Sequence, residues 1–515
     1  MKKTLLILGV SLAVFACKKE ATQEEIIGYA STITSDELKE KLYTYASDEH
    51  QGRETGSEGQ KKALEYIKNH YVSINVPSAV SPDNYFQEVP LKNIKTPKVS
   101  LTVNGISYNY FEDFISQTSA ATGSFSAKEI VYAGYGINHE NTNDYENLDV
   151  KGKIVIVKSG EPKDKAGNYL VSGTKEISKW SNGRQAISAK RTAAKDNGAK
   201  ALFFMDDALF TRYSKFYKAR HDKGTSRSLS LPKKNEEIYH FLISEKLGNA
   251  MVSNINDSTN SAVVASTVDV DYESVSIDLP SSNVAAIIKG SEKPEEYIII
   301  SSHSDHIGLT NDGLINNGAD DDGSGSVAVL EIAEAFKAAA ENGHGPKRSI
   351  VFLHVTGEER GLLGSRYYTD YSPLFPLENT VADLNIDMIG RIDPKRDSDN
   401  RNYLYIIGSD KLSTELHNIS EEVNKTYTNI EFDYTYNDEN DPNRFYYRSD
   451  HYNFAKNNIP IIFYFNGTHD DYHRPTDTPD KIEYDLLENR TRLVFHTAWE
   501  LANREKRIVA DKATE

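Results

Sequence analysis

The segment Tyr297–Ser302 reads YIIISS and runs directly into His303. Three later segments are also rich in apolar residues, namely Ser349–Val355 (SIVFLHV), Val381–Ile386 and Ile459–Phe465 (IPIIFYF). Continuous apolar runs of this length are typical of strands that are buried on both faces of a sheet. The four runs therefore predict an α/β fold, in which helices cover both sides of a mixed, largely parallel sheet as a three-layer α/β/α sandwich.

One helix of this sandwich is indicated between the first two runs. Apolar residues recur there at helical spacing, and charged residues lie on the opposite side. The apolar set is Ala328, Ile332, Ala335, Phe336 and Ala339, and the charged set is Glu331, Glu334 and Lys337. We expect the apolar stripe to pack on the sheet.

Composition limits the size of the core and the class of partner. The chain has 515 residues, 38% hydrophobic and 26% charged, which is a globular composition but too long for one ordinary core. The formal net charge of −17 argues against a nucleic-acid partner, because phosphate binding needs clustered Lys and Arg. Two folded units without nucleic acid are therefore expected.

A change from helix-like to strand-like sequence patterns divides the chain. Helix-capping signatures at Thr34 and Ser57 indicate where folding begins. Strand-like runs then predict a β-rich insert over residues 121–276. The main domain is accordingly expected in two parts, 34–120 and 277–510.

The N-terminus has the features of an export signal. Two lysines precede an apolar stretch from Leu5 to Phe15, and Cys17, the only cysteine, follows it. The stretch is too short to span a bilayer. It resembles a bacterial lipoprotein signal, with residues 1–16 removed, residues 17–33 as a polar tether and a lipid on Cys17 as the membrane attachment. This implies a membrane-anchored lipoprotein on the periplasmic side or cell surface; a plain secretory signal with a chance cysteine is the alternative.

Residues that can bind metal follow each of the four apolar runs. In open α/β sheets, active sites gather at the carboxyl ends of strands, where loops from distant parts of the sequence converge. A further aspartate lies in the glycine-bounded loop NNGADDDGSG (316–325), just before the expected helix. In chain order the candidates are His303, Asp305, Asp321, Glu358, Glu359, Asp387 and His473.

This set of side chains suits two zinc ions. Zinc takes nitrogen and oxygen ligands, and catalytic zinc sites leave one position open for water or substrate. Two zinc ions that share a bridging carboxylate need one histidine and one further carboxylate each. Three ligand carboxylates neutralise most of the charge on two dications and leave the pair electrophilic. Cobalt or manganese can replace zinc in such a site.

Each candidate also has a structural interpretation. A lone histidine is usually a surface or core residue, the aspartate-rich loop alone can bind calcium or form a turn, and Glu358-Glu359 alone can be a solvated pair. Their joint placement after buried strands favours a shared site. His354, His451 and His469 lack comparable partners and rank lower as ligands.

Six motifs resemble the zinc-dependent aminopeptidases of peptidase family twenty-eight. In chain order they are HSDHIG (303–308), NNGADDDGSG (316–325), TGEERGLLGS (356–365), LNIDMIG (384–390), RSDHYNF (448–454) and DYHRPTDT (471–478). The resemblance covers nearly all of the mature chain, since the insert is similar to the protease-associated domain of secreted peptidases. It implies an exopeptidase that acts on peptides, most simply an aminopeptidase.

The resemblance assigns ligands to two zinc ions per chain. By matching position, His303, Asp321 and Asp387 hold one ion, and Asp321, Glu359 and His473 hold the other. Asp321 is then the bridge, and an unusual peptide geometry after it is expected.

Three further residues receive roles beside the metals. Glu358 matches the family's general base, which takes a proton from water so that a zinc-bound hydroxide attacks the peptide carbonyl. Asp305 is suited to orient the ring of His303. Tyr472 either stabilises the developing oxyanion, as in some relatives, or serves packing.

Other functions share this fold. Carboxypeptidase relatives have the same metal site, and Arg391 or Arg448 can reach a substrate carboxylate or form a structural salt bridge. A glutaminyl-cyclase-like acyltransferase uses a single zinc, and a nonenzymatic binding protein resembling the transferrin receptor has lost its metal site. The complete ligand set disfavours the last two.

Overall fold

The computed structural model describes residues 20–118, 120–224, 228–232, 237–258 and 261–513. The predicted signal peptide and Cys17 lie outside these residues. Within them, no helix combines the length and the apolar character that crossing a membrane requires. The chain divides into two units, one formed by the residues up to Val89 and from Pro280 onward, the other by Pro90–Leu279.

A nine-stranded sheet runs in the order β10-β1-β13-β15-β14-β16-β19-β17-β18. The strands β15, β14, β16 and β19 are parallel to one another, whereas β13 and β17 flank them in the antiparallel sense. The four apolar runs of the sequence form these parallel strands, which confirms the mixed, largely parallel sheet. The bounds are β1 (Phe86–Ile94), β10 (Ser228–Ser230), β13 (Ser276–Ile288), β14 (Lys293–His303), β15 (Arg348–Val355), β16 (Thr380–Ile386), β17 (Tyr403–Ile407), β18 (Glu431–Asp433) and β19 (Ile461–Phe465).

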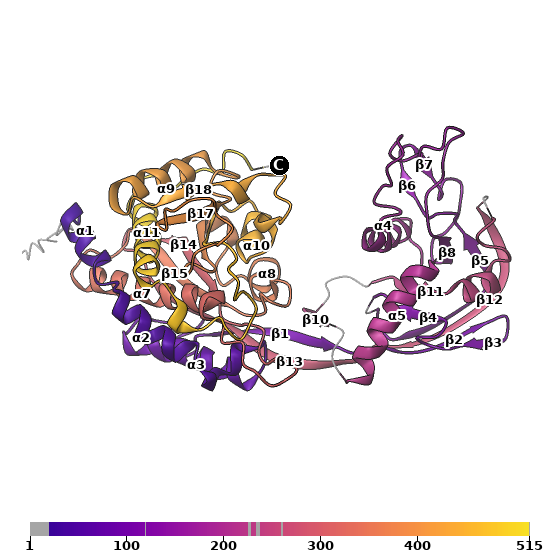
Figure 1. Ribbon diagram of the computed structural model, residues 1–515, viewed down its shortest axis with the longest axis horizontal. Helices are drawn as coiled ribbons and strands as arrows, with labels where there is room; N and C mark the ends of the chain where they lie inside the picture. The colour runs from indigo at the N-terminus through magenta and orange to yellow at the C-terminus, as the bar shows by residue number, and fades with distance from the viewer. Residues whose placement is uncertain (1–19, 119, 225–227, 233–236, 259–260, 514–515) are drawn as a thin grey trace, which may run out of the picture. The chain divides into compact units, whose positions relative to one another are not determined.

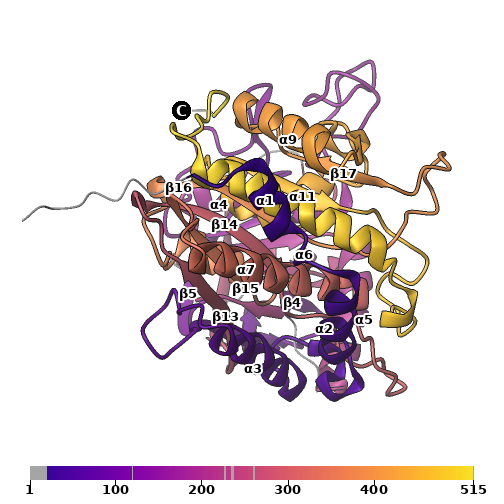
Figure 2. The same ribbon diagram turned by 90° about the vertical axis from the view of Figure 1, so that its left-hand side faces the viewer.

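Helices cover both faces of the parallel strands. Alternate residues face opposite layers, so Ile298 and Ile300 of β14 join one apolar core and Ile299 joins the other. Figure 2 shows α7 and α11 in front of β14, and Figure 1 shows α8 and α10 on the opposite side. The predicted three-layer sandwich is therefore confirmed. The first layer holds α1 (Gln23–Ala30), α2 (Ser35–Tyr45), α3 (Glu58–Ser73), α7 (Gly325–Glu341), α9 (Thr414–Tyr427) and α11 (Tyr484–Asn503); the second holds α8 (Leu363–Asp370) and α10 (His451–Ala455).

The segment predicted as a tether is helical where the structure describes it. Thr22 and Glu25 form a capping box at the start of α1. Tyr29 of this helix stacks on Trp499, and its hydroxyl lies 2.8 Å from Nδ1 of His344. These tertiary contacts stabilise a helix that is too short to be stable alone. The main domain therefore begins before Thr34, contrary to the prediction.

The charged side of α7 is also covered in part, which differs from the simple amphipathic pattern. Glu331 is buried, and Nζ of Lys41 from α2 lies 2.5 Å from its Oε1. The packing of α2 against α7 removes Glu331 from water. A buried carboxylate needs a cationic partner, which Lys41 supplies.

The second unit contains an eight-stranded sheet in the order β3-β2-β12-β5-β8-β9-β11-β4. The predicted border at residue 121 is wrong, because β2 pairs with β12 and β4 pairs with β11 inside this sheet. Its main elements are β2 (Lys98–Val103), β3 (Ile106–Tyr108), β4 (Phe114–Ser116), β5 (Gly123–Tyr132), β8 (Ile154–Lys158), β9 (Ala201–Met205), β11 (Tyr239–Ile243), β12 (Ala262–Glu273), α4 (Gly183–Asp196), α5 (Asp207–Asp222) and α6 (Glu245–Met251).

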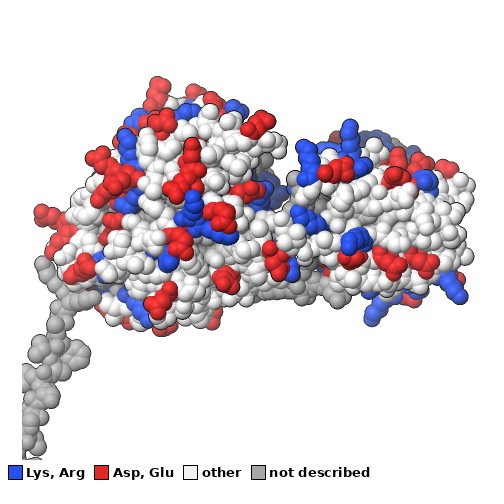
Figure 3. All heavy atoms as spheres, turned by 90° about the horizontal axis from the view of Figure 1, so that it is seen from below, with Lys and Arg blue, Asp and Glu red and all other residues white. Residues whose placement is uncertain are grey.

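Charged side chains are mixed on the face shown in Figure 3. Acidic and basic residues lie among one another there on each unit. The sequence as a whole has a formal net charge of −17. The exclusion of a nucleic-acid partner stays a prediction.

Candidate metal centre

The parallel strands bring the predicted ligands to one edge of the sheet. His303 is the last residue of β14, Asp387 directly follows β16, and Glu359 lies shortly beyond β15. Asp321 lies between β14 and α7, and His473 follows β19. Because these strands run parallel, their carboxyl ends and the loops after them meet at the same edge.

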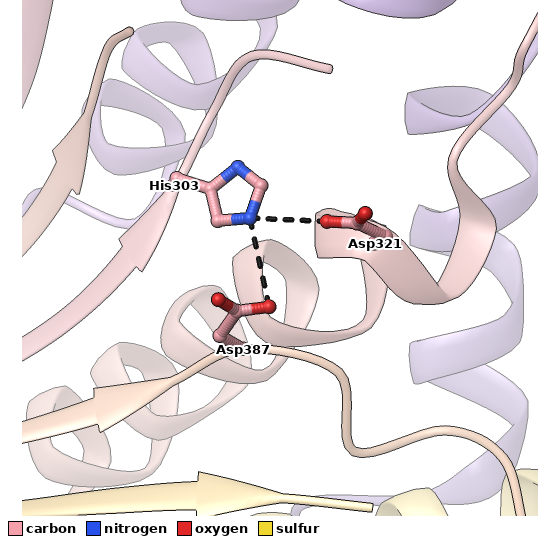
Figure 4. A group of neighbouring side chains, drawn as sticks. All are labelled: His303, Asp321 and Asp387. Atoms are coloured by element: carbon pink, nitrogen blue, oxygen red, sulfur yellow. Dashed lines mark ion pairs between the residues drawn. The ribbon is translucent and has the colours of Figure 1, made fainter. Parts of the chain in front are cut away.

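Three of these side chains form a first donor group, shown in Figure 4. Nε2 of His303 lies 3.1 Å from Oδ1 of Asp321 and 3.6 Å from Oδ1 of Asp387. All three residues are buried. Both carboxylates face the same ring nitrogen, so the group can hold one cation between a nitrogen and two oxygens.

A second donor group shares Asp321 with the first. Nε2 of His473 lies 3.0 Å from Oδ2 of Asp321 and 3.3 Å from Oε1 of Glu359. The two oxygens of Asp321 therefore face different groups, as a bridging carboxylate must. The peptide bond between Asp321 and Asp322 is cis, in agreement with the unusual geometry expected at this position.

Several atoms of the two groups lack hydrogen-bond partners although they are buried. They include Nε2 of His303 and Oε1 of Glu359. Buried polar atoms without partners are costly. Imidazole nitrogens and carboxylate oxygens are also the donors that zinc prefers. The residues present therefore fit two divalent cations.

In the metal-free protein, the carboxylates favour positive charge on the histidines. Burial lowers the pKa of His303, but Asp387 and Asp321 outweigh it and hold this pKa well above its usual value. Burial also opposes the charge on His473, whose bonds to Asp321 and Glu359 raise its pKa to about 10. The centre therefore attracts cations, whether protons or metal ions.

Glu358 shares a pocket with residues of the first donor group. It lines a pocket together with Asp321 and Asp387. Desolvation raises the pKa of Glu358 well above its usual value, and the carboxylates of Glu359 and Asp387 add to this effect against the opposing influence of His303. A carboxyl group whose pKa is raised in this way is suited to accept and return a proton near neutral pH.

Asp305 acts on the centre in a different way from the prediction. Nδ1 of His303 lies 2.9 Å from the backbone oxygen of Asp305, so the carbonyl and not the carboxylate orients this ring. The carboxylate instead accepts hydrogen bonds from the hydroxyl of Thr55 at 2.7 Å and from the N–H of Glu358 at 3.1 Å. The side chain of Asp305 therefore positions Glu358.

Tyr472 forms part of the pocket wall. Its ring stacks on that of His473, with centroids 3.9 Å apart. The apolar part of the pocket lining consists of Met388, Phe445, Phe463 and Phe465. Tyr472 thus has a packing contact, and its role toward an oxyanion stays a prediction.

The loop 316–325, which carries Asp321 and is called the metal loop below, is held in place by hydrogen bonds to residues outside the two donor groups. The carboxylate of Asp477 accepts the N–H groups of Asp320 and Asp321 at 3.1 to 3.3 Å. Asp322 accepts the N–H of His303 and of Met388, both at 3.1 Å. These bonds connect the loop that carries Asp321 to the ends of β14 and β16.

Arg53 is a supporting residue that the sequence did not reveal. The side chain is buried and stacks on Tyr45 at 4.7 Å. Its guanidinium donates to the backbone oxygens of Asn317 at 2.6 Å and Gly318 at 2.9 Å. The loop around Arg53 therefore supports the loop that carries Asp321.

His306 is a second residue that the sequence analysis missed. Its Nδ1 lies 2.9 Å from Oε1 of Glu359 and 3.7 Å from Oδ2 of Asp321. The one available signal was its place in the HSDHIG motif, three residues after His303.

The lower-ranked histidines lie outside both donor groups. His354 contacts the hydroxyl of Tyr71 at 2.7 Å, and His451 contacts the backbone oxygen of Tyr446 at 2.8 Å. His469 lies 3.2 Å from Oδ2 of Asp320, behind the metal loop.

Residues 283–498 match the model of peptidase family M28. Over these residues the chain is similar to the members of family M28. The match covers the strands and loops that carry every ligand of the two donor groups.

The similarity of this chain to individual known proteins is low. A protein named probable leucine aminopeptidase from Arthroderma benhamiae is 29% identical over 249 residues, which are 47% of this chain and 63% of that protein. Among solved structures, an aminopeptidase from Aneurinibacillus sp. strain AM-1 is 19% identical, with a TM-score of 0.49 over 95% of this chain and 98% of that one. A zinc aminopeptidase from Bacillus subtilis is 18% identical, with a TM-score of 0.47 over 94% and 98%. The chain thus spans 63% or less of the length of the first curated relatives it matches.

Proposed function

We propose that this chain is a di-zinc exopeptidase, specifically an aminopeptidase, that hydrolyses the first peptide bond of its substrate. The observation that carries the proposal is the pair of donor groups that share Asp321 and have Glu358 beside them. The names of the curated relatives, leucine aminopeptidases, support the choice of the N-terminal end.

Two sets of side chains would hold the ions. The first is His303, Asp321 and Asp387, and the second is Asp321, Glu359 and His473. When bound, two zinc ions or other divalent transition metals would polarise the peptide carbonyl and make a nearby water molecule more acidic.

The protein's own groups would move the proton and steady the reacting atoms. Glu358 accepts a proton from the attacking water and returns it to the amine that leaves as the C–N bond breaks. The carboxylate of Asp305 fixes the backbone of Glu358 through its N–H. Tyr472, on the same pocket wall, donates a hydrogen bond to the carbonyl oxygen as negative charge develops there.

A comparison of free and blocked N-termini tests the assignment. We expect the zinc-loaded protein to release the first residue from Leu-Gly-Gly amide. N-acetylation removes the positive charge of the terminal amine, and an opposite charge of the pocket left buried and unpaired costs about 3 kcal/mol. We therefore expect N-acetylation to lower kcat/KM by at least about 100-fold. Mass spectrometry of the products measures both. Equal cleavage of the acetylated peptide would contradict the aminopeptidase assignment but would not contradict the proposed metal centre.

One observation favours a carboxypeptidase as the second candidate. Arg448 lines the same pocket as Glu358, and its guanidinium packs over Phe445 at 4.8 Å. In the described part of the chain it forms no salt bridge. Arg391, the other candidate, is instead bound to Asp471 at 2.9 Å. An exposed guanidinium at the pocket can receive a substrate carboxylate.

Substitution of Arg448 decides between the two ends of the peptide. Under the aminopeptidase proposal we expect Arg448→Ala to change kcat/KM equally for Leu-Gly-Gly and its C-terminal amide. A loss of about 10- to 100-fold confined to the free acid would favour the carboxypeptidase, since a charge-assisted hydrogen bond contributes about 1.5 to 3 kcal/mol. Arg444→Ala is the matched control, because Arg444 is exposed, stacks on Tyr447 and lies outside the pocket lining.

The two complete donor groups support a two-zinc peptidase over a one-zinc acyltransferase or a nonenzymatic binding protein.

Further proposals concern parts of the chain away from the centre. We also propose that the second unit is a protease-associated domain that shapes access to substrates, on the basis of its strand pattern. Export and a lipid anchor at Cys17 are proposed from the signal sequence alone.

A further inference from the structure

His306 is held against the second donor group by backbone contacts. Its side chain is fully buried, and its N–H donates to the backbone oxygen of Arg53 at 3.1 Å. Gly318 leaves the space that the ring occupies, because a Cβ at this glycine would lie 2.6 Å from Cδ2 of His306. The position of the imidazole is therefore fixed by the fold.

The distances around His306 match those between ligands of one metal ion. A tetrahedral zinc site with bonds of about 2.0 to 2.1 Å places its ligand atoms about 3.3 Å apart. Nδ1 of His306 lies 2.9 Å from Oε1 of Glu359 and 3.7 Å from Oδ2 of Asp321. Nε2 of His473 lies 3.3 Å and 3.0 Å from the same two oxygens. Both histidines thus approach the same pair of carboxylate oxygens at ligand spacing.

The ring of His306 approaches Glu359 as an ion pair at 2.9 Å, without the direction of a regular hydrogen bond. Nδ1 and Nε2 of this ring are buried without a hydrogen-bond partner, and so is Oε1 of Glu359. A buried imidazole that makes no hydrogen bond is costly. A shared cation would satisfy the nitrogen and the oxygen together.

We propose that His306 is a fourth protein ligand of the second metal ion, which it binds through Nδ1 beside Asp321, Glu359 and His473. The proposal rests on the metal occupancy put forward above and not on the choice of peptide substrate.

This ligand makes the two metal positions unequal. The first donor group has three protein ligands, the number that catalytic zinc sites use while keeping a position open. The second would have four, so its ion would be held by one more side chain than the first. The second ion would accordingly be retained more tightly than the first, while both ions stay available for the proposed chemistry.

Metal retention tests the assignment without reference to activity. Wild-type protein and His306→Ala are loaded with zinc and dialysed against graded concentrations of dipicolinate, and the zinc retained per chain is measured by mass spectrometry. We expect one of the two release steps to occur at a zinc affinity at least about 100-fold weaker in His306→Ala, since even residues that only support a ligand contribute about 10- to 100-fold.

His496→Ala is the matched control. His496 is also buried with an unpartnered Nδ1, but it lies in α11 outside both donor groups. We expect its two release steps to match those of the wild type. Two unchanged steps in His306→Ala would overturn the proposal, whereas a wild type that retains no zinc would instead contradict the proposed function.

A measurement on the unmodified protein covers the case in which His306→Ala fails to fold. In cobalt-loaded wild type, each bound imidazole contributes one exchangeable N–H proton with a paramagnetically shifted NMR signal. Three such signals are expected from His303, His306 and His473. Two signals would show that His306 is not a ligand.

Discussion

Replacing Glu358 with glutamine is expected to lower kcat by about 10²- to 10⁴-fold, the usual contribution of a general base, while both metal ions stay bound. Glutamine keeps the shape of the side chain but cannot accept the proton of the attacking water. Glu358 lies in the pocket beside Asp321 and Asp387 and is absent from both donor groups. Steady-state kinetics and elemental analysis of the same sample measure the two effects.

The adjacent glutamate supplies the control for this experiment. Glu359→Gln removes a charged ligand, so it is expected to lower activity through loss of zinc from the second donor group. Added zinc should then restore part of the activity of Glu359→Gln and none of that of Glu358→Gln. Normal turnover in Glu358→Gln would exclude this residue as the base.

Replacing Asp321 with alanine is expected to release both ions, because its two carboxylate oxygens face different donor groups. Zinc content should fall from two ions per chain toward none at a chelator concentration that leaves the wild type loaded. Asp387→Ala removes a ligand of the first group alone, and it should retain one ion under the same conditions. Elemental analysis of the three proteins gives the comparison.

Circular dichroism of each variant shows whether the fold is kept. If Asp321→Ala is folded and still binds two ions, Asp321 is not the bridge. If Asp387→Ala loses both ions, the two groups are not separable in the way that their distances indicate.

Much of the fold and of the ligand set could be predicted from the sequence. Buried parallel strands such as Tyr297–Ser302 have continuous apolar runs, and the rule that sites form at their carboxyl ends places His303, Glu359 and Asp387 together without any knowledge of distances. The strand ends alone do not predict that Asp321 bridges two ions; this proposed role came from the resemblance to a known family.

The contacts that sequence reasoning missed join residues without a common pattern. Arg53 supports a loop 264 residues further along the chain, and nothing in its own loop indicates a buried partner. His306 follows His303 too closely to be distinguished from an ordinary loop residue until the ring is placed against Glu359. The carboxylate of Asp305 was correctly placed beside the centre, but the choice between its side chain and its carbonyl as the partner of His303 depends on the local backbone.

The border between the two units was placed too late for a similar reason. Residues 98–116 alternate as the strands of any antiparallel sheet do, and their pairing partners lie in β12 and β11, far along the chain. The same limit applies to α1, whose stability depends on contacts with Trp499 and His344 that local propensity does not report.

Anomalous diffraction at the zinc edge, from crystals of the zinc-loaded protein, tests the central claim most directly. We expect two peaks about 3.5 Å apart, one against His303 and Asp387 and one against Glu359 and His473, with Asp321 between them. A single peak, or peaks away from these side chains, would contradict the shared two-metal centre.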